Sequence, residues 1–201
     1  MENNSWHFLT QTTTSMKLIS DIEIKNKTLN DIDFAEYENC EFINCNFSNG
    51  NLSQYVFIDC RFTNCDMSNC NINDTSFQEI NFKGCKLMGL SFDACKGFLL
   101  SFSFTDCNLS YSTFQKLKLK KTSFVNCNMT ECDFYDTDLQ SSVINNCNII
   151  GAIFENTNLF KADLRNSYNL LIDIERNNIK KAKFNFAQVN GLLAKWEVKL
   201  S

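Results

Sequence analysis

The sequence predicts a solenoid, a chain wound into a stack of short coils, and two regularities of spacing carry that prediction. Large apolar residues recur every five positions over most of the chain, a period that belongs neither to an α-helix nor to a β-strand. A second series, made of small residues and cysteines, precedes the large residues by two positions. A repeat sustained this long outweighs local secondary-structure propensity, and so short a repeat indicates segments that each turn a corner.

The large apolar series runs in two registers joined by a slip of two residues. The first register contains Phe42, Phe47, Leu52, Phe57, Phe62, Met67, Ile72, Phe77, Phe82, Leu87 and Phe92. The second contains Phe104, Leu109, Phe114, Leu119, Phe124, Met129, Phe134, Leu139, Ile144, Ile149, Phe154, Leu159 and Leu164. The pattern continues more loosely to Val189, and proline, the residue that would interrupt it most strongly, is absent from the chain.

The polar position between the two series is often Asn or Asp, so the repeating unit reads small, Asn/Asp, Phe/Leu, polar, variable. In this unit the sequence resembles the pentapeptide-repeat proteins, whose motif is Ala-Asp/Asn-Leu-x-x; the stretch KADLRNS at residues 161–167 is the best copy. The resemblance covers about residues 39–190. It implies an all-β fold, a right-handed, four-sided (quadrilateral) β-helix in which four pentapeptides complete a coil of twenty residues.

A twenty-residue coil can be tested against the sequence independently of the five-residue count. Steps of twenty, and of twenty-two across the slip, connect like residues with like, as expected for side chains stacked on adjacent β rungs. We therefore expect two columns in the structural core. One contains Phe42, Phe62, Phe82, Phe104 and Phe124, and the other contains Cys45, Cys65, Cys85, Cys107, Cys127 and Cys147.

The eleven cysteines are expected to be reduced, and the ten that keep the register, all except Cys95, are expected to be buried in the core, because cysteine packs well as a small apolar side chain. Rungs about 4.8 Å apart with parallel Cβ vectors do not suit a disulfide. A zinc site is the alternative, but the cysteines are five apart rather than in Cys-x2-Cys pairs, and no histidine lies near them. We expect no metal ligands and no cofactor.

The predicted organisation is a flexible N-terminal leader at residues 1–20, a β-helix at residues 21–190 and a C-terminal cap at residues 191–201. The repeat is irregular before residue 39, where Ile24, Leu29 and Phe34 keep it weakly, and breaks of register are expected near residues 35–41 and 93–103. Residues 187–195 suit a short helix, and Trp196, Val198 and Leu200 alternate like a strand. Because an open solenoid end must be covered, Leu192, Leu193 and Trp196 are candidates for a simple cap or for a dimer contact.

The charge of the chain is modest and unevenly distributed. The formal net charge of −4 argues against direct binding of nucleic acid, no apolar run is long enough to span a membrane, and the N-terminus does not resemble a signal peptide, so we expect a cytoplasmic protein. Residues 28–60 and 122–160 contain acids but no Lys or Arg. A solvated face is one reading of these runs; a partner-binding acidic surface is the other, with candidates Glu36, Glu38, Glu41, Glu131 and Asp136.

No catalytic constellation is visible: the single histidine, His7, lies in the leader, and there is no Gly-rich phosphate loop or nucleophile elbow. An enzyme is therefore not expected. The quinolone-resistance (Qnr-like) members of the family are similar in size, and they bind DNA gyrase and topoisomerase IV as mimics of duplex DNA. The resemblance thus implies a DNA mimic that protects against quinolones. A structural or adaptor scaffold for another protein partner is the alternative.

Overall fold

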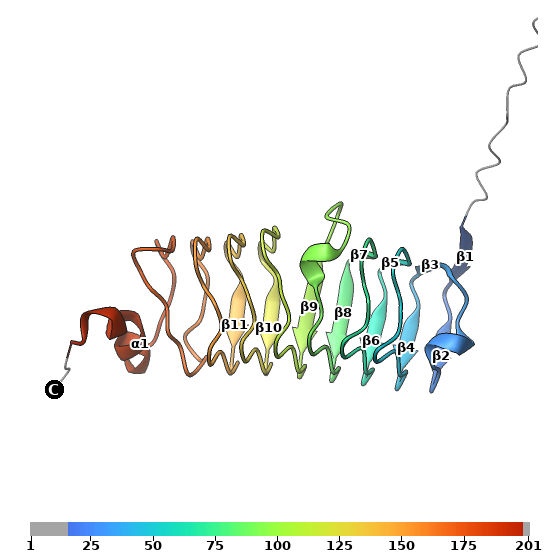
Figure 1. Ribbon diagram of the computed structural model, residues 1–201, viewed down its shortest axis with the longest axis horizontal. Helices are drawn as coiled ribbons and strands as arrows, with labels where there is room; N and C mark the ends of the chain where they lie inside the picture. The colour runs from blue at the N-terminus through green and yellow to red at the C-terminus, as the bar shows by residue number, and fades with distance from the viewer. Residues whose placement is uncertain (1–15, 199–201) are drawn as a thin grey trace, which may run out of the picture.

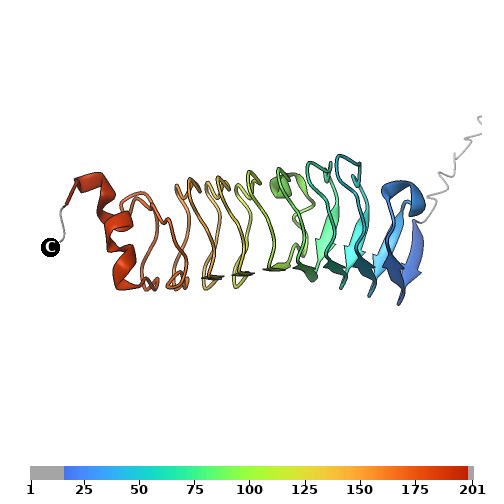
Figure 2. The same ribbon diagram turned by 90° about the horizontal axis from the view of Figure 1, so that it is seen from below.

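The computed structural model describes residues 16–198, which wind into an elongated rod of stacked coils (Figure 1). The first coils, with β1 and β2, lie at one end, and the single short helix α1 lies at the other. The view turned by 90° shows the same row of coils from a second side (Figure 2). The molecule is therefore a β-helix, in which the chain advances along the rod by one coil at a time.

Two parallel sheets run along adjacent sides of the rod. The first has the order β1-β3-β5-β7, with strands β1 (Lys17–Ser20), β3 (Ala35–Glu38), β5 (Val56–Ile58) and β7 (Ser76–Gln78). The second has the order β2-β4-β6-β8-β9-β10-β11. Its strands are β2 (Glu23–Lys25), β4 (Glu41–Ile43), β6 (Arg61–Thr63), β8 (Ile80–Lys83), β9 (Phe102–Thr105), β10 (Ser123–Val125) and β11 (Val143–Asn145). The other two sides are joined coil to coil by isolated parallel bridges, such as Asn46 with Asp66 and Thr113 with Asp133.

The register of the second sheet stacks identical residues. Phe42 lies opposite Phe62 and Phe62 opposite Phe82, so the coil length is twenty residues. The aromatic rings stack face to face, with centroids 4.7 Å apart for Phe42 and Phe62 and 5.1 Å apart for Phe104 and Phe124. All five predicted phenylalanines of this column are buried. A second column of stacked rings, Phe92, Phe114, Phe134 and Phe154, fills another side of the interior.

The corners between sides use the left-handed backbone region. Two residues after most large core residues, φ is positive, as at Asn44 (53°), Asn64 (54°) and Asn126 (55°). Asn and Asp tolerate this region better than most other residues. The Asn or Asp that precedes a core residue stabilises the backbone of the same side of the coil. The side-chain oxygens of Asn46 and Asp133 accept hydrogen bonds from the backbone N–H groups two residues later, at 3.0 and 2.8 Å.

All eleven cysteines are buried and none forms a disulfide. The predicted cysteine column lies beside the phenylalanine column, and most of its thiols donate to backbone carbonyls of the preceding coil, as Cys65 Sγ does to Phe42 O at 3.3 Å and Cys85 Sγ to Phe62 O at 3.2 Å. The Cys127 thiol instead donates to Val125 O of its own coil at 3.3 Å. Each thiol therefore fills a corner of the core and also satisfies its weak donor.

The N-terminal coil differs from the expectation. Residues 1–15 of the predicted flexible leader lie outside the described residues, but Lys17–Ser20 is strand β1, which pairs with β3. The first coil has eighteen residues rather than twenty, since Ile24 lies opposite Phe42 and Ile19 opposite Tyr37.

The irregularity in this coil lies at the 3₁₀ turn Leu29–Asp31, earlier than the expected residues 35–41. This turn shortens one side of the coil. As a consequence Tyr37 fills the core position, while Phe34 is 53% exposed.

The coil that contains residues 93–103 is two residues longer than its neighbours, because Phe82 lies opposite Phe104. After the 3₁₀ turn Phe92–Ala94, residues 96–101 bulge outward, and the first sheet ends at β7. Figure 1 shows this segment as the loop that projects between β8 and β9.

The C-terminal end is closed by a turn and a helix. The 3₁₀ turn Phe186–Gln188 leads into α1 (Val189–Leu193), and a second 3₁₀ turn, Ala194–Trp196, follows, so the expected strand-like alternation at Trp196 is wrong. Leu200, the last residue of that pattern, lies outside the described residues. The Gln188 side chain donates to Leu164 O and Ser167 O, both at 2.7 Å, which satisfies carbonyls of the last coil. Gly191 is required here, since a Cβ would lie 1.9 Å from Leu170 O.

The phenylalanine column should be the main source of stability. We expect Phe82→Ala to lower the free energy of unfolding by about 3–5 kcal/mol, the usual cost of emptying a large core site. Asn126→Ala, which removes an exposed side chain hydrogen-bonded to Asp106, should cost less than about 1 kcal/mol. Urea unfolding followed by circular dichroism measures both; equal losses would show that inside and outside have been misassigned.

The buried thiols should make the protein less stable in alkali. Burial raises the pKa of Cys60 to about 12 and that of Cys70 to about 11, from an ordinary value of 9.0. Because the pKa is higher in the folded state, a thiol loses its proton more readily in the unfolded chain. Its contribution to the free energy of unfolding is complete below the pKa of the unfolded thiol and is lost as the pH rises toward the pKa of the folded thiol. The free energy of unfolding should therefore fall above pH 9.

A variant with Cys60→Ala and Cys70→Ala tests this cause. Between pH 9 and 10.5 its free energy of unfolding should fall less steeply, by up to about 1.4 kcal/mol per pH unit for each thiol removed. A slope unchanged from that of the wild-type chain would show that other groups are responsible.

Candidate interaction surface

The outer surface of the rod is the candidate site for binding a partner. Within residues 16–198, no group of three or more His, Cys, Asp or Glu side chains is arranged to hold a metal ion. The same part of the chain has no helix that is both long and apolar enough to cross a bilayer. His7, the only histidine, lies outside the described residues. The candidate features of the outer surface are charged and apolar patches.

The structure separates the five predicted acidic residues. Glu36 and Glu38 lie on β3 in the first sheet, whereas Glu41 lies on β4 in the second. Glu131 and Asp136 occupy two different corners, since they follow different core residues, Met129 and Phe134, by two positions. The five residues are therefore spread over several sides and corners of the rod, because a run of sequence passes around all four sides of a coil.

A different set of acids does share one side. On the first sheet, Glu36 and Glu38 point outward from β3, and the corner that follows this sheet carries Asp21, Asp59 and Glu79. Backbone hydrogen bonds align this corner from coil to coil, from Asp21 N to Glu38 O at 3.1 Å and from Asp59 N to Gln78 O at 2.8 Å. We call these five residues the acidic wall. Its strand β5 adds the outward, half-buried Val56 and Ile58.

The same side of the rod becomes basic beyond residues 96–101. Lys121 and Lys161 lie at the same corner as Asp59. Like Asp59, each has a positive φ and donates its backbone N–H to a carbonyl of the next coil, Gln140 O for Lys121 and Lys180 O for Lys161. All the lysines on this part of the side are exposed, and we call them the lysine wall: Lys118, Lys120, Lys121, Lys161, Lys180 and Lys181.

The charge of the lysine wall is largely uncompensated. Lys120 lies 3.3 Å from Asp138, but among the described residues no carboxylate lies within 4.0 Å of the other five ammonium groups. On other sides some cations are paired, as Arg176 is with Glu155 at 2.7 Å, whereas in the described part of the chain others, such as Lys83 and Lys116, have no carboxylate within 4.0 Å. The sequence holds a signal for this wall that we did not use, since Lys121, Lys161 and Lys181 differ by multiples of the twenty-residue coil.

The loop at residues 96–101 lies between the two walls and exposes apolar side chains. Phe98 is 74% exposed and Leu99 61%, and Leu99 has a positive φ of 55°, which is unfavourable for leucine. An exposed apolar pair at the boundary between opposite charges is a feature typical of contact surfaces.

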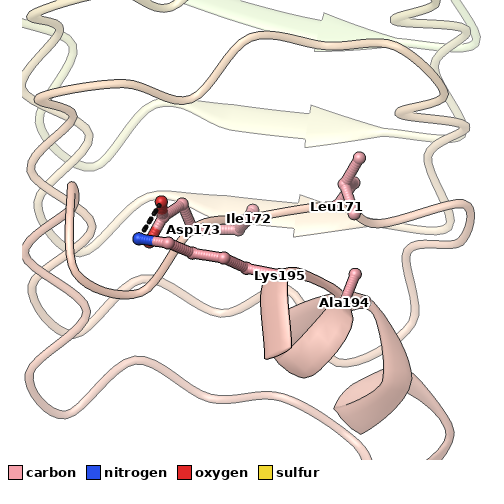
Figure 3. Close-up of a pocket in the computed structure, with 6 residues that line it drawn as sticks. Leu171, Ile172, Asp173, Ala194 and Lys195 are labelled. Atoms are coloured by element: carbon pink, nitrogen blue, oxygen red, sulfur yellow. Dashed lines mark hydrogen bonds and ion pairs between the residues drawn. The ribbon is translucent and has the colours of Figure 1, made fainter. Parts of the chain in front are cut away.

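The C-terminal cap borders a mainly apolar recess of about 360 Å³, which is lined by Leu171, Ile172, Asp173, Gly191, Ala194 and Lys195 (Figure 3). The ammonium of Lys195 closes one side by pairing with Asp173 at 3.1 Å and with Glu175 at 2.5 Å. These bonds raise the pKa of Lys195, and the pKa of Asp173 is lowered, first by the backbone N–H of Glu175 and then by Lys195.

Of the predicted cap residues, Leu192 and Leu193 are half-buried, and Trp196 is exposed, with its ring 5.6 Å from the Lys195 ammonium. Leu171, at the mouth of the recess, is 64% exposed.

Comparison with known proteins agrees with this geometry. The family described as "Pentapeptide repeat region" matches residues 35–102, and the one described as "Pentapeptide repeats (8 copies)" matches residues 107–146 and 138–168. No curated protein matches the chain significantly.

Solved structures of the same architecture are similar to the chain. Two trypsin-treated forms of QnrB1, a plasmid-mediated fluoroquinolone resistance protein, each share 21% identity with it. One covers 92% of this chain and 100% of its own at a TM-score of 0.62, and the other covers 90% and 99% at 0.63. HetL, a pentapeptide-repeat protein involved in heterocyst differentiation regulation in Nostoc sp. strain PCC 7120, shares 14% identity over 84% of this chain and 85% of its own, at a TM-score of 0.47.

The two family matches together span most of the coils. Buried core columns and left-handed corners recur through these residues, with a twenty-residue spacing everywhere except in the longer coil that contains residues 93–103. The chain therefore belongs to the pentapeptide-repeat family.

Proposed function

We propose that this protein is a non-catalytic binding rod whose partner is a type II topoisomerase, DNA gyrase or topoisomerase IV. The acidic wall carries the proposal: five carboxylates lie on one side and at one corner of a straight rod, so they present a regular negative charge to a basic groove. The likeness of the fold to QnrB1, a fluoroquinolone resistance protein, supports a protective effect against quinolones. The cytoplasm is the proposed compartment, and it suits eleven unbridged cysteines.

The DNA-like part of the rod is limited to one half. Beyond residues 96–101 the same side carries the lysine wall, whereas duplex DNA is negative along its whole length. We therefore propose that only the acidic half enters a DNA-binding groove. Long-range attraction between this half and a basic groove would raise the association rate more than the final affinity.

The lysine wall favours a second function, that of an adaptor for a partner other than a topoisomerase. Five lysines without a carboxylate partner give the C-terminal half a local positive charge on a chain that is negative overall. An adaptor would use both walls, one for each of two partners or for two parts of one partner. The topoisomerase assay below separates the two functions.

A supercoiling assay with purified DNA gyrase and a fluoroquinolone tests the proposal. The wild-type protein should restore supercoiling in the presence of the drug. A variant with Glu36→Lys and Glu38→Lys should need about tenfold more protein for the same effect, because each reversed charge repels a basic groove. The matched control, with Asp106→Lys and Glu131→Lys, makes the same change in net charge away from the acidic wall and should act like the wild type.

Two outcomes would contradict this assignment. No effect of the wild-type protein on gyrase or topoisomerase IV, with or without the drug, would leave the adaptor function. Equal weakening of both variants would show that net charge matters and that the acidic wall does not.

We further propose that two copies associate through their C-terminal ends. The recess beside α1 is mainly apolar, and Leu171 in its lining is exposed. Trp196 and Val198, which follow the lining residue Lys195 in the sequence, are exposed as well. A two-fold contact between two such ends would cover these side chains with the same surface of the partner copy. The combined rod would be twice as long, with one acidic half at each end and the two lysine walls toward its centre.

Sedimentation velocity at micromolar concentration tests the association. The wild-type chain should sediment as a dimer and Leu171→Glu as a monomer, because the new charge would be buried without a partner. Ile150→Glu, an equally polar change on an exposed side wall, should remain a dimer. If the wild-type chain is a monomer, dimerisation is rejected and α1 is only a cap.

A further inference from the structure

One side of the rod carries both charged walls, and each wall occupies its own half of that side. Strand pairing joins β1, β3, β5 and β7 in the acidic half. Isolated bridges join the successive coils of the basic half, from Lys118 to Asn178. The loop at residues 96–101 lies between the halves, with Leu100 bridged to Gln78, and it projects from the rod (Figure 1). This side is therefore acidic in one half, basic in the other and apolar at its centre.

The charges of the two halves are arranged symmetrically about the loop. Acids and lysines occupy coils at equal distances from it. The matched pairs at one, three and four coils from the loop are Glu79 with Lys121, Glu38 with Lys161, and Asp21 with Lys181. The coils two away from the loop are the exception, because Asp59 has the uncharged Ser141 as its counterpart. Two halves that match in position and differ in sign are complementary to each other.

A two-fold axis would turn this symmetry into a contact. If two rods lie antiparallel about an axis that crosses this side at the loop, each acidic coil faces a basic coil of the other copy. The rotation keeps the place of a residue across the width of the side, so a corner faces the same corner. Glu79 and Lys121 both lie at this corner, with φ of 56° and 62°, and so do Asp21 and Lys181, with φ of 58° and 61°. Corner acids would therefore face corner lysines.

The loop would give such a contact an apolar centre. Phe98 and Leu99 are exposed on the loop, and an axis at this point brings the loops of both copies next to each other. Each exposed pair would then be covered by the other, which removes apolar surface from water. Placing the loops side by side shifts the facing coils by about one rung, roughly 4.8 Å, a distance that long Glu and Lys side chains can span.

We propose that this side of the rod binds a second copy of the chain, antiparallel, with each acidic wall against the lysine wall of the other copy. Exposed ion pairs are individually weak and are screened by salt, so the pairing is weak and depends on ionic strength. It would cover the acidic wall, so a second copy and a basic groove would compete for the same surface. The inference requires neither a topoisomerase partner nor the C-terminal contact.

Sedimentation of the Leu171→Glu chain tests the pairing, because this variant lacks the proposed C-terminal contact. At high micromolar concentration it should be a dimer in about 0.01 M salt, where the Debye length is about 30 Å, and a monomer in about 1 M salt, where it is about 3 Å. At low micromolar concentration and about 0.15 M salt, with a Debye length of about 8 Å, it should be a monomer. A monomer under all three conditions, or a dimer that survives 1 M salt, would overturn the proposal.

Exchanged charges test which surfaces meet. In the same background, one variant carries Glu38→Lys and Glu79→Lys, and the other carries Lys121→Glu and Lys161→Glu. Each alone should be a monomer in 0.01 M salt, as in the experiment above, because its facing walls repel each other. An equal mixture should form dimers, because each new lysine then faces a new glutamate. Both variants remain negative overall, so net charge cannot cause this recovery. A mixture that stays monomeric would overturn the pairing of the walls.

A matched control changes the net charge on other sides of the rod. The variant with Asp106→Lys and Glu131→Lys, again with Leu171→Glu, should form dimers at low salt like the Leu171→Glu chain. Loss of the dimer in this control would show that the walls are not the contact. Circular dichroism should show that all of these variants are folded.

A new thiol on the loop tests the position of the axis. All eleven native cysteines are buried, and apart from its chain neighbours Gly97 has no atom within 4 Å of the place that a Cβ would occupy, so Gly97→Cys adds an accessible thiol. At low salt a short bismaleimide should join two copies of this variant, in the Leu171→Glu background, several-fold faster than two copies with Ile150→Cys, an exposed position on another side. Equal rates would overturn an axis at the loop.

Discussion

Successive coils are joined by parallel backbone hydrogen bonds, such as those from Asn64 N to Lys83 O and from Asp66 N to Cys45 O, at 2.8 and 2.9 Å. The rest of the structure depends on this ladder. It holds neighbouring coils at the rung spacing of a β-sheet, about 4.8 Å, so a residue is always packed against the residue one coil away. Like side chains then fill like spaces, and for this reason phenylalanine rings stack in one column and thiols in another.

The sequence could predict the interior of the rod because a core position must be apolar in every coil. Phe62 and Phe82 are each constrained by both neighbours in the column, and a twenty-residue step finds them. The first coil was harder to predict. A count forward by fives from Ile24 places Phe34 in the core, whereas a count back by five from Phe42 places Tyr37 there. The backbone decides between the two, since the 3₁₀ turn Leu29–Asp31 makes this coil two residues shorter than the others. Such a turn leaves no strong mark in the sequence.

The outer surface could not be predicted from runs of charge. Residues that are close in sequence, such as Glu38 and Glu41, lie on different sheets, while Lys121 and Lys161, two coils apart, lie on one corner. An outward position is not constrained by packing, so it need not hold the same type of residue in every coil. The fold has to be known before the twenty-residue step can be applied to charged residues as well as to apolar ones.

Because each coil contacts mainly the coil before it and the coil after it, the rod has an unusual response to tension. A force applied to its two ends would detach coils from an end one after another, because the hydrogen bonds between the last coil and its neighbour bear the full force until they break. Every released coil of twenty residues would lengthen the chain by about 66–72 Å while shortening the rod by only about 4.8 Å. The protein would therefore extend in nearly equal steps, and the coil with two additional residues would give one step slightly longer than the others.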